Sequence, residues 1–81
     1  MKAAITAHEL EVLAAIPDMA AGQVLIQVLR RELEHETKHA LACVKAGNED
    51  RQRVSLYRAA ALDEILDFLT TEAREAHARG R

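Results

Sequence analysis

Aromatic residues are almost absent from this chain of 81 residues, which contains one Phe, one Tyr and no Trp. Hydrophobic residues make up 49% of the sequence, and alanine, whose side chain buries little area, supplies much of that share. Buried apolar surface contributes about 25 cal/mol per Å², so an alanine-rich core is weakly stabilised. A domain of this size also buries a limited core. We therefore expect the chain to self-associate or to dock on a larger partner.

Cysteine is limited to Cys43, so no intramolecular disulfide can form and a reducing compartment is expected. Its neighbours Ala42 and Val44 indicate a small apolar residue near a packing face rather than a reactive thiol. No apolar run approaches the roughly 20 residues that span a bilayer. His8 and Glu9 interrupt the N-terminal region before a signal-peptide core could form. We expect a soluble protein that is not secreted.

Neither sign of charge dominates: the net charge is −2 and the sequence pI is near 6.1. No dense basic stripe is present, which argues against a dedicated nucleic-acid-binding protein. One modest basic cluster consists of Arg51, Arg53 and Arg58. We expect these arginines to be solvated or paired with nearby carboxylates, with phosphate binding as the alternative.

The single proline, Pro17, separates a short helix from the rest of the chain. Thr6 and Glu9 fit a capping box, and Ile5 and Leu10 occupy the two positions of a hydrophobic staple. Pro17 disfavours helical geometry at the residue before it, which predicts a helix over about residues 7–15. A helix this short is marginal alone, so it must dock.

Glycine is also scarce, and Gly47 marks the one break between two long segments with leucine-type residues at helical spacing. Asp18 is the expected N-cap of a helix over about 19–46, and Gly22 would allow a neighbouring helix to approach closely. Gly47 suits the left-handed residue that ends this helix, and Asn48 suits the N-cap of a third helix over about 49–78. The last residues, 75–81, are expected to fray.

The predicted fold is therefore all-α: one domain, residues 1–81, with a short N-terminal helix followed by a long antiparallel, coiled-coil-like helical hairpin. If the turn lies at Gly47 and Asn48, facing residues have numbers that sum to about 95. The expected pairs are Leu33 with Leu62, Leu29 with Leu66, Ile26 with Leu69, and Gly22 with Ala73.

The apolar arc of the third helix is wider than one partner helix can bury. Two apolar residues of the second helix, Leu25 and Val28, also need a partner surface to cover them. Either the first helix or another chain must cover this surface, and we predict that it is an oligomerisation surface. Its members are Leu25, Val28, Tyr57, Ala61, Ile65 and Phe68.

The segment His35–His39 matches the H-E-x-x-H pattern, in which two histidines one helical turn apart bind zinc and a glutamate acts as general base. Glu64 would be a distant third ligand. The cation of Lys38 inside the motif, the absence of a predicted strand and the small size of the hairpin all argue against a metallopeptidase. We predict no metal site, no cofactor and no enzymatic activity, and leave adventitious metal binding at His35 and His39 open.

Other polar residues are assigned to solvated surfaces. We expect the carboxylate pairs Glu32/Glu36 and Asp63/Asp67 to face solvent and His8 and His77 to be exposed and isolated. Ser55 has no partner arrangement in the sequence that suggests a nucleophile.

The layout resembles small helical proteins encoded among the head and tail structural genes of bacteriophages. The resemblance rests on three segments: Val24–Leu33, Gly47–Gln52 and Ala61–Leu69. It implies a non-enzymatic virion or assembly component, located in the virion or the host cytoplasm. Such a protein would form a homo-oligomer or dock on a larger capsid, portal or tail protein.

Two other functions compete with this interpretation. The chain could be a small helical regulator that binds and inhibits a host protein, or, more remotely, a zinc-dependent hydrolase built on His35, Glu36 and His39. No nucleic acid, membrane or small-molecule substrate is expected as a partner.

Overall fold

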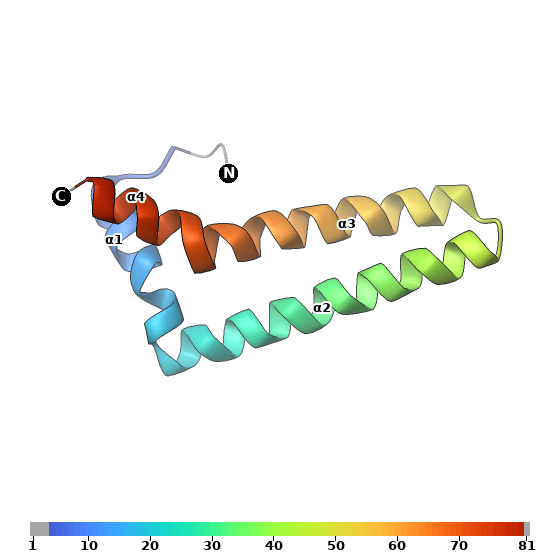
Figure 1. Ribbon diagram of the computed structural model, residues 1–81, viewed down its shortest axis with the longest axis horizontal. Coiled ribbons are helices and arrows are strands. Elements are labelled where there is room, and N and C mark those ends of the chain that lie inside the picture. The colour runs from blue at the N-terminus through green and yellow to red at the C-terminus, as the bar shows by residue number, and fades with distance from the viewer. Residues whose placement is uncertain (1–3, 81) are drawn as a thin grey trace.

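The structure, a computed structural model, describes residues 4–80. It is all-α, as predicted: a short helix is followed by a long antiparallel hairpin (Figure 1). Helix α1 (Ala7–Ala15) leads through a 3₁₀ turn, η1 (Ile16–Asp18), into α2 (Ala20–Lys45). The return arm comprises α3 (Glu49–Asp67), a π-helical turn, η2 (Phe68–Glu72), and α4 (Ala73–Arg79).

Helix α1 begins at the predicted capping box. The Thr6 backbone N–H donates to Glu9 Oε1 at 2.8 Å, and the Glu9 N–H donates to Thr6 Oγ1 at 3.1 Å. These bonds satisfy two of the donors that a helix N-terminus leaves without an intrahelical acceptor. The helix ends at Ala15, because Pro17 then directs the chain into the 3₁₀ turn.

The capping box makes a pH-dependent contribution to the stability of α1. Bonds from the Thr6 backbone N–H and then from its hydroxyl group hold the pKa of Glu9 below its ordinary value. A lowered carboxylate pKa stabilises the folded helix at neutral pH, and this contribution is lost as the pH falls through the folded-state pKa. We expect a ¹³C NMR titration of the Glu9 carboxyl to give a depressed pKa, which Thr6→Ala raises only partway because the backbone donor remains. An ordinary pKa in the parent protein would contradict the capping assignment.

The start of α2 differs from the prediction that Asp18 is its N-cap. Asp18 belongs to the 3₁₀ turn, and Met19, the extended residue after it, occupies the cap position without a side-chain bond. The reason is that Pro17 initiates a 3₁₀ turn which runs through Asp18. The freed carboxylate instead pairs with Arg74 of α4.

The turn of the hairpin has the predicted conformations. Gly47 is left-handed, with φ of 71°. The N–H of Asn48 bonds to the carbonyl of Cys43 and that of Gly47 to the carbonyl of Val44, the two bonds of a Schellman motif. Asn48 then caps α3 by accepting the Arg51 N–H at 3.2 Å.

The two long arms meet along a seam with alternating spacings of three and four residues, the repeat of a coiled coil. On α2 the buried and half-buried seam residues are Ile26, Leu29, Leu33, Glu36, Ala40 and Cys43. On the return arm they are Gln52, Ser55, Ala59, Leu62, Leu66 and Leu69. At the open end the arms separate: Ala73 and Ala76 of α4 pack against α1, and Gly22 lies against Ile16 of η1. Contacts between Glu36 and Arg58 and between His39 and Ser55 pair residues whose numbers sum to 94, within one residue of the predicted register.

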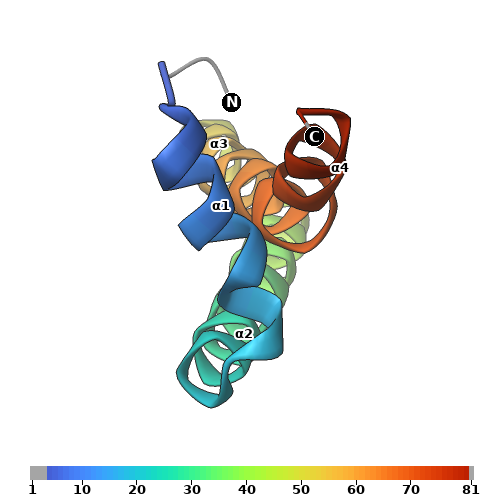
Figure 2. The same ribbon diagram turned by 90° about the vertical axis from the view of Figure 1, so that its left-hand side faces the viewer.

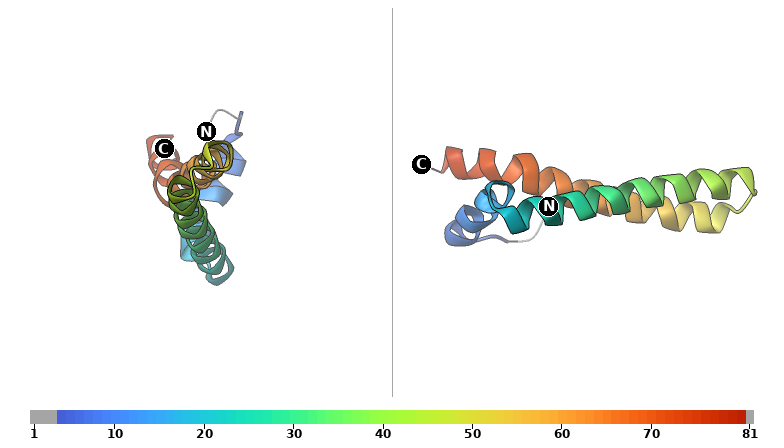
Figure 3. Two further views of the ribbon diagram at one scale, coloured as in Figure 1. Left: turned by 90° about the vertical axis from the view of Figure 1, so that its right-hand side faces the viewer. Right: turned by 90° about the horizontal axis from the view of Figure 1, so that it is seen from below.

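The core lies at the open end of the hairpin, where α1 packs against η2 and α4 of its own chain (Figure 2). Ala14 forms a buried cluster with Phe68, Leu69 and Ala73, and α1 adds Leu10 and Leu13 around it. The molecule measures 50 × 26 × 14 Å. Because a helix with side chains is about 10–12 Å across, the hairpin is one helix thick. Figure 3 shows α1 on one side of this layer, and we call that side the α1-side face.

Candidate functional site

The H-E-x-x-H segment is helical, but its residues have different surroundings. His35 and His39 each precede a seam residue and therefore lie on the α1-side face, whereas Glu36 lies within the seam. The Nδ1 of His39 is 2.6 Å from Ser55 Oγ and 3.9 Å from Cys43 Sγ. No group of three or more His, Cys, Asp or Glu side chains is placed to hold a metal ion anywhere in residues 4–80.

Glu36 contradicts the prediction that it faces solvent, since it is only 8% exposed. Its Oε1 is 3.8 Å from Arg58 Nη1, beyond hydrogen-bonding distance, and its Oε2 is buried without a hydrogen-bond partner among the described residues. A buried polar atom without a partner costs about 1–3 kcal/mol. This carboxyl group therefore lowers the stability of the hairpin by about that amount.

Glu36 lies in the half of the seam near the turn, where the seam residues are small or polar. We call this half the distal seam: Glu36, Ala40, Cys43, Gln52, Ser55 and Ala59. Cys43 is buried, as predicted, and Ser55 is only 2% exposed. The sequence analysis missed the contact between Ser55 and His39. It could have found the distal seam, because the spacing of Ile26, Leu29 and Leu33 continues onto Glu36, Ala40 and Cys43.

Most of the predicted oligomerisation surface is exposed. Leu25, Val28, Ala61 and Ile65 each precede a seam residue, and in an antiparallel helix pair such positions lie on the same side. These four residues form what we call the apolar strip of the α1-side face. Tyr57 is 69% exposed but lies at the outer edge of α3.

Phe68 is the exception to the predicted surface. It is 8% exposed and packs in the core with Ala14 of α1. The physical reason is that α1 folds back over the open end of its own hairpin and covers the apolar arc at that level. Phe68 is therefore a core residue and not part of a surface that a partner could reach in this fold.

The opposite face carries its own exposed apolar side chains, which the sequence analysis did not single out. Leu41, Val44 and Leu56 each follow a seam residue and are at least half exposed. Apolar side chains thus remain accessible on both faces of the hairpin.

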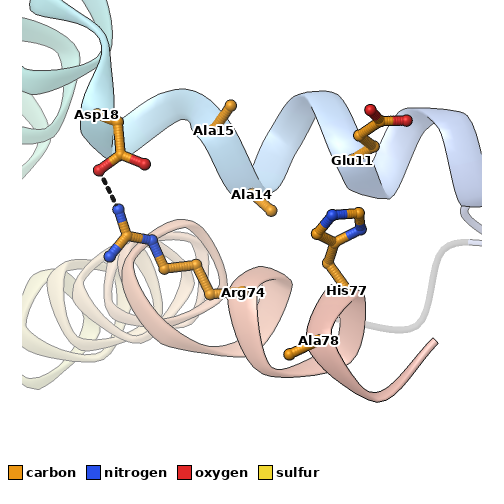
Figure 4. Close-up of a pocket in the computed structure, with 7 residues that line it drawn as sticks. All are labelled: Glu11, Ala14, Ala15, Asp18, Arg74, His77 and Ala78. Atoms are coloured by element: carbon orange, nitrogen blue, oxygen red, sulfur yellow. Dashed lines mark hydrogen bonds and ion pairs between the residues drawn. The ribbon is translucent and has the colours of Figure 1, made fainter. Parts of the chain in front are cut away.

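A pocket of about 400 Å³ lies between α1 and α4 (Figure 4). Ala14, Ala15 and Ala78 line it, and its polar lining residues are Glu11, Asp18, Arg74 and His77. His77 is half-buried here, contrary to the predicted exposure, and its ring points toward α1. The alanine lining and the existing pair between Arg74 and Asp18 mark this pocket as a packing junction between the two helices.

A second pocket, of about 330 Å³, lies near the turn of the hairpin. It is lined by His39, Asp50, Arg51, Val54, Ser55 and Arg58. The structure therefore brings together two of the three clustered arginines, Arg51 and Arg58, and leaves Arg53 out of the pocket.

Among the described residues, no single helix is both long and apolar enough to cross a membrane. The pair formed by residues 7–18 and 20–45, bent by 80°, meets the length and composition criteria only when taken together.

Comparison with known proteins finds no family model, no curated protein and no solved structure that matches this chain.

Proposed function

We propose that this chain is a non-enzymatic structural or assembly protein that works through helix–helix contacts. In the form that the resemblance in sequence suggests, it is a small phage virion or virion-assembly component. It self-associates or docks on a larger capsid, portal or tail protein.

The observation that carries the proposal is the exposed apolar surface of a hairpin only one helix thick. Among residues 4–80, eleven large hydrophobic residues are at least 37% exposed. Within this set Leu25, Val28 and Ile65 lie with Ala61 on one face. An exposed apolar patch on a small domain is typical of a protein–protein contact. The weakly filled distal seam adds to the argument, because a partner would supply apolar contacts that the chain's own core lacks.

The apolar strip is the best candidate for the first contact. Its residues, Leu25, Val28, Ala61 and Ile65, come from both arms of the hairpin, so a partner helix laid between the arms would touch both. Glu32 and Arg58, which also precede seam residues, provide opposite charges on the same face. A partner with a similar face, including a second copy, can therefore match both the apolar and the charged positions.

The first experiment is light scattering of the purified protein over a concentration series. A stable oligomer across the series would support self-association through an apolar face. A monomer at every concentration would contradict self-association and leave only docking on a different partner to be tested by pull-down.

A double substitution tests which face is used. We expect Val28→Glu with Ile65→Glu to reduce the oligomer to a monomer while circular dichroism stays helical, because two buried charges without partners oppose the contact. Leu41→Glu with Leu56→Glu, on the opposite face, is the matched control and should leave the mass unchanged. An unchanged mass in the first variant, or equal loss in both, would contradict the assignment to the apolar strip.

A further inference from the structure

Five of the six residues that line the pocket near the turn have no role in the proposed helix–helix contact, and Arg58 is the exception. We infer that it binds a phosphate group, with Arg51 and Arg58 as the charged ligands and Ser55 and His39 as hydrogen-bonding partners. The pocket, of about 330 Å³, has ample room for a phosphate and its substituent.

The fold determines which of the three clustered arginines lie at the pocket. Arg51 and Arg58 each precede a seam residue and so converge on the α1-side face, whereas Arg53 follows Gln52 and lies on the other face. Asp50 is the acidic residue that lines the pocket. Within residues 4–80 Asp50 forms no ion pair with either arginine, whereas Arg58 is exposed and pairs with the Glu36 carboxylate, as expected from the sequence.

The Arg58 guanidinium has N–H donors available for a ligand. Glu36 Oε1 is 3.8 Å from Arg58 Nη1, which is a Coulombic contact and not a hydrogen bond. The Arg58 side chain is 67% exposed. A guanidinium carries five N–H donors in a planar fork, a geometry that matches two oxygens of a phosphate.

A further donor comes from the 2.6 Å contact between His39 Nδ1 and Ser55 Oγ. If the Ser55 hydroxyl donates to Nδ1, the proton of the neutral imidazole is on Nε2. If Nδ1 carries the proton and donates to Ser55, the hydroxyl proton is available instead. In both tautomers one N–H or O–H donor of the pair remains for a ligand oxygen, in addition to the arginines.

The test is a titration of the ¹⁵N-labelled full chain with inorganic phosphate at constant ionic strength, with chloride as the reference anion. We expect saturable shifts at the Ser55 amide and at the Arg51 and Arg58 side chains. Arg58→Gln should weaken binding about tenfold, as expected for the loss of a charge-assisted hydrogen bond. Arg53→Gln is the matched control and should change it less than about twofold.

Three results would overturn the assignment. The first is a linear response to phosphate that equals the response to chloride. The second is an equal loss in Arg53→Gln and Arg58→Gln, because it would mean that general surface charge attracts the anion. The third is a short DNA duplex that binds with equal dependence on all three arginines, which would assign them to a phosphate backbone on the surface and not to the pocket. Arg51→Gln, also outside the seam, replaces Arg58→Gln should circular dichroism show that the latter loses helix.

Discussion

Replacing Glu36 with leucine is expected to raise the free energy of unfolding by about 1–3 kcal/mol. Glu36 occupies a seam position with one carboxylate oxygen 3.8 Å from Arg58 and the other buried without a partner. Leucine would remove the desolvated carboxyl group and extend the apolar seam beyond Leu33 toward the turn. Urea denaturation at a fixed, low protein concentration measures the change.

Glu34→Leu is the matched control for this substitution, since it makes the same chemical change on the exposed surface. Glu34 pairs with Lys38 at 3.0 Å in an i, i+4 arrangement, and both side chains are largely exposed. Such a pair contributes about 0.3–0.5 kcal/mol, so the control should lose a little stability. A loss of stability in Glu36→Leu comparable to that of a disrupted core would mean that the buried carboxylate is held by interactions stronger than the contact with Arg58.

Gly22→Ala is expected to lower the free energy of unfolding by about 3 kcal/mol, although alanine favours a helix over glycine by up to about 1 kcal/mol. A Cβ at Gly22 would overlap with the backbone carbonyl oxygen of Ile16. Backbone cannot rotate away as a side chain can, so the 3₁₀ turn and the α1 that precedes it would have to move. The same denaturation experiment gives the magnitude, and amide exchange should localise the loss to α1 and η1.

Alanine substitutions at Gly80 and Gly47 provide reference values for the effect at Gly22. At Gly80 the nearest atoms to an added Cβ are 3.5 and 3.6 Å away, an ordinary contact, so Gly80→Ala should change stability by less than about 0.5 kcal/mol. Gly47 has open space around it but a φ of +71°, so Gly47→Ala should cost about 1–2 kcal/mol through backbone strain alone. A Gly22→Ala protein as stable as the parent would show that the turn before α2 relaxes without cost.

The local structure of the chain followed from the sequence, because it depends on neighbours within four residues. Thr6 and Glu9 form a capping box, Pro17 ends α1, and Gly47 with Asn48 makes the turn, all through short-range bonds. The prediction of Asp18 as N-cap was wrong, because Asp18 lies in the 3₁₀ turn that begins at Ile16, and its carboxylate pairs with Arg74 of α4. The π-helical turn was also not predicted, and there the Thr70 hydroxyl bonds to the Leu66 carbonyl in competition with the helix ladder.

The sequence by itself determined the all-α hairpin and its register, because hydrophobic spacing and chain breaks specify which faces two adjacent helices present to each other. The tertiary structure determined which residues of the wide apolar arc are buried and which remain exposed. It buried Phe68 under α1, left Leu25, Val28, Ala61 and Ile65 exposed, and placed Ser55 beside His39. These outcomes depend on where α1 docks and on which residues meet across 16 or more positions of sequence. A spacing pattern within one helix carries no information about either.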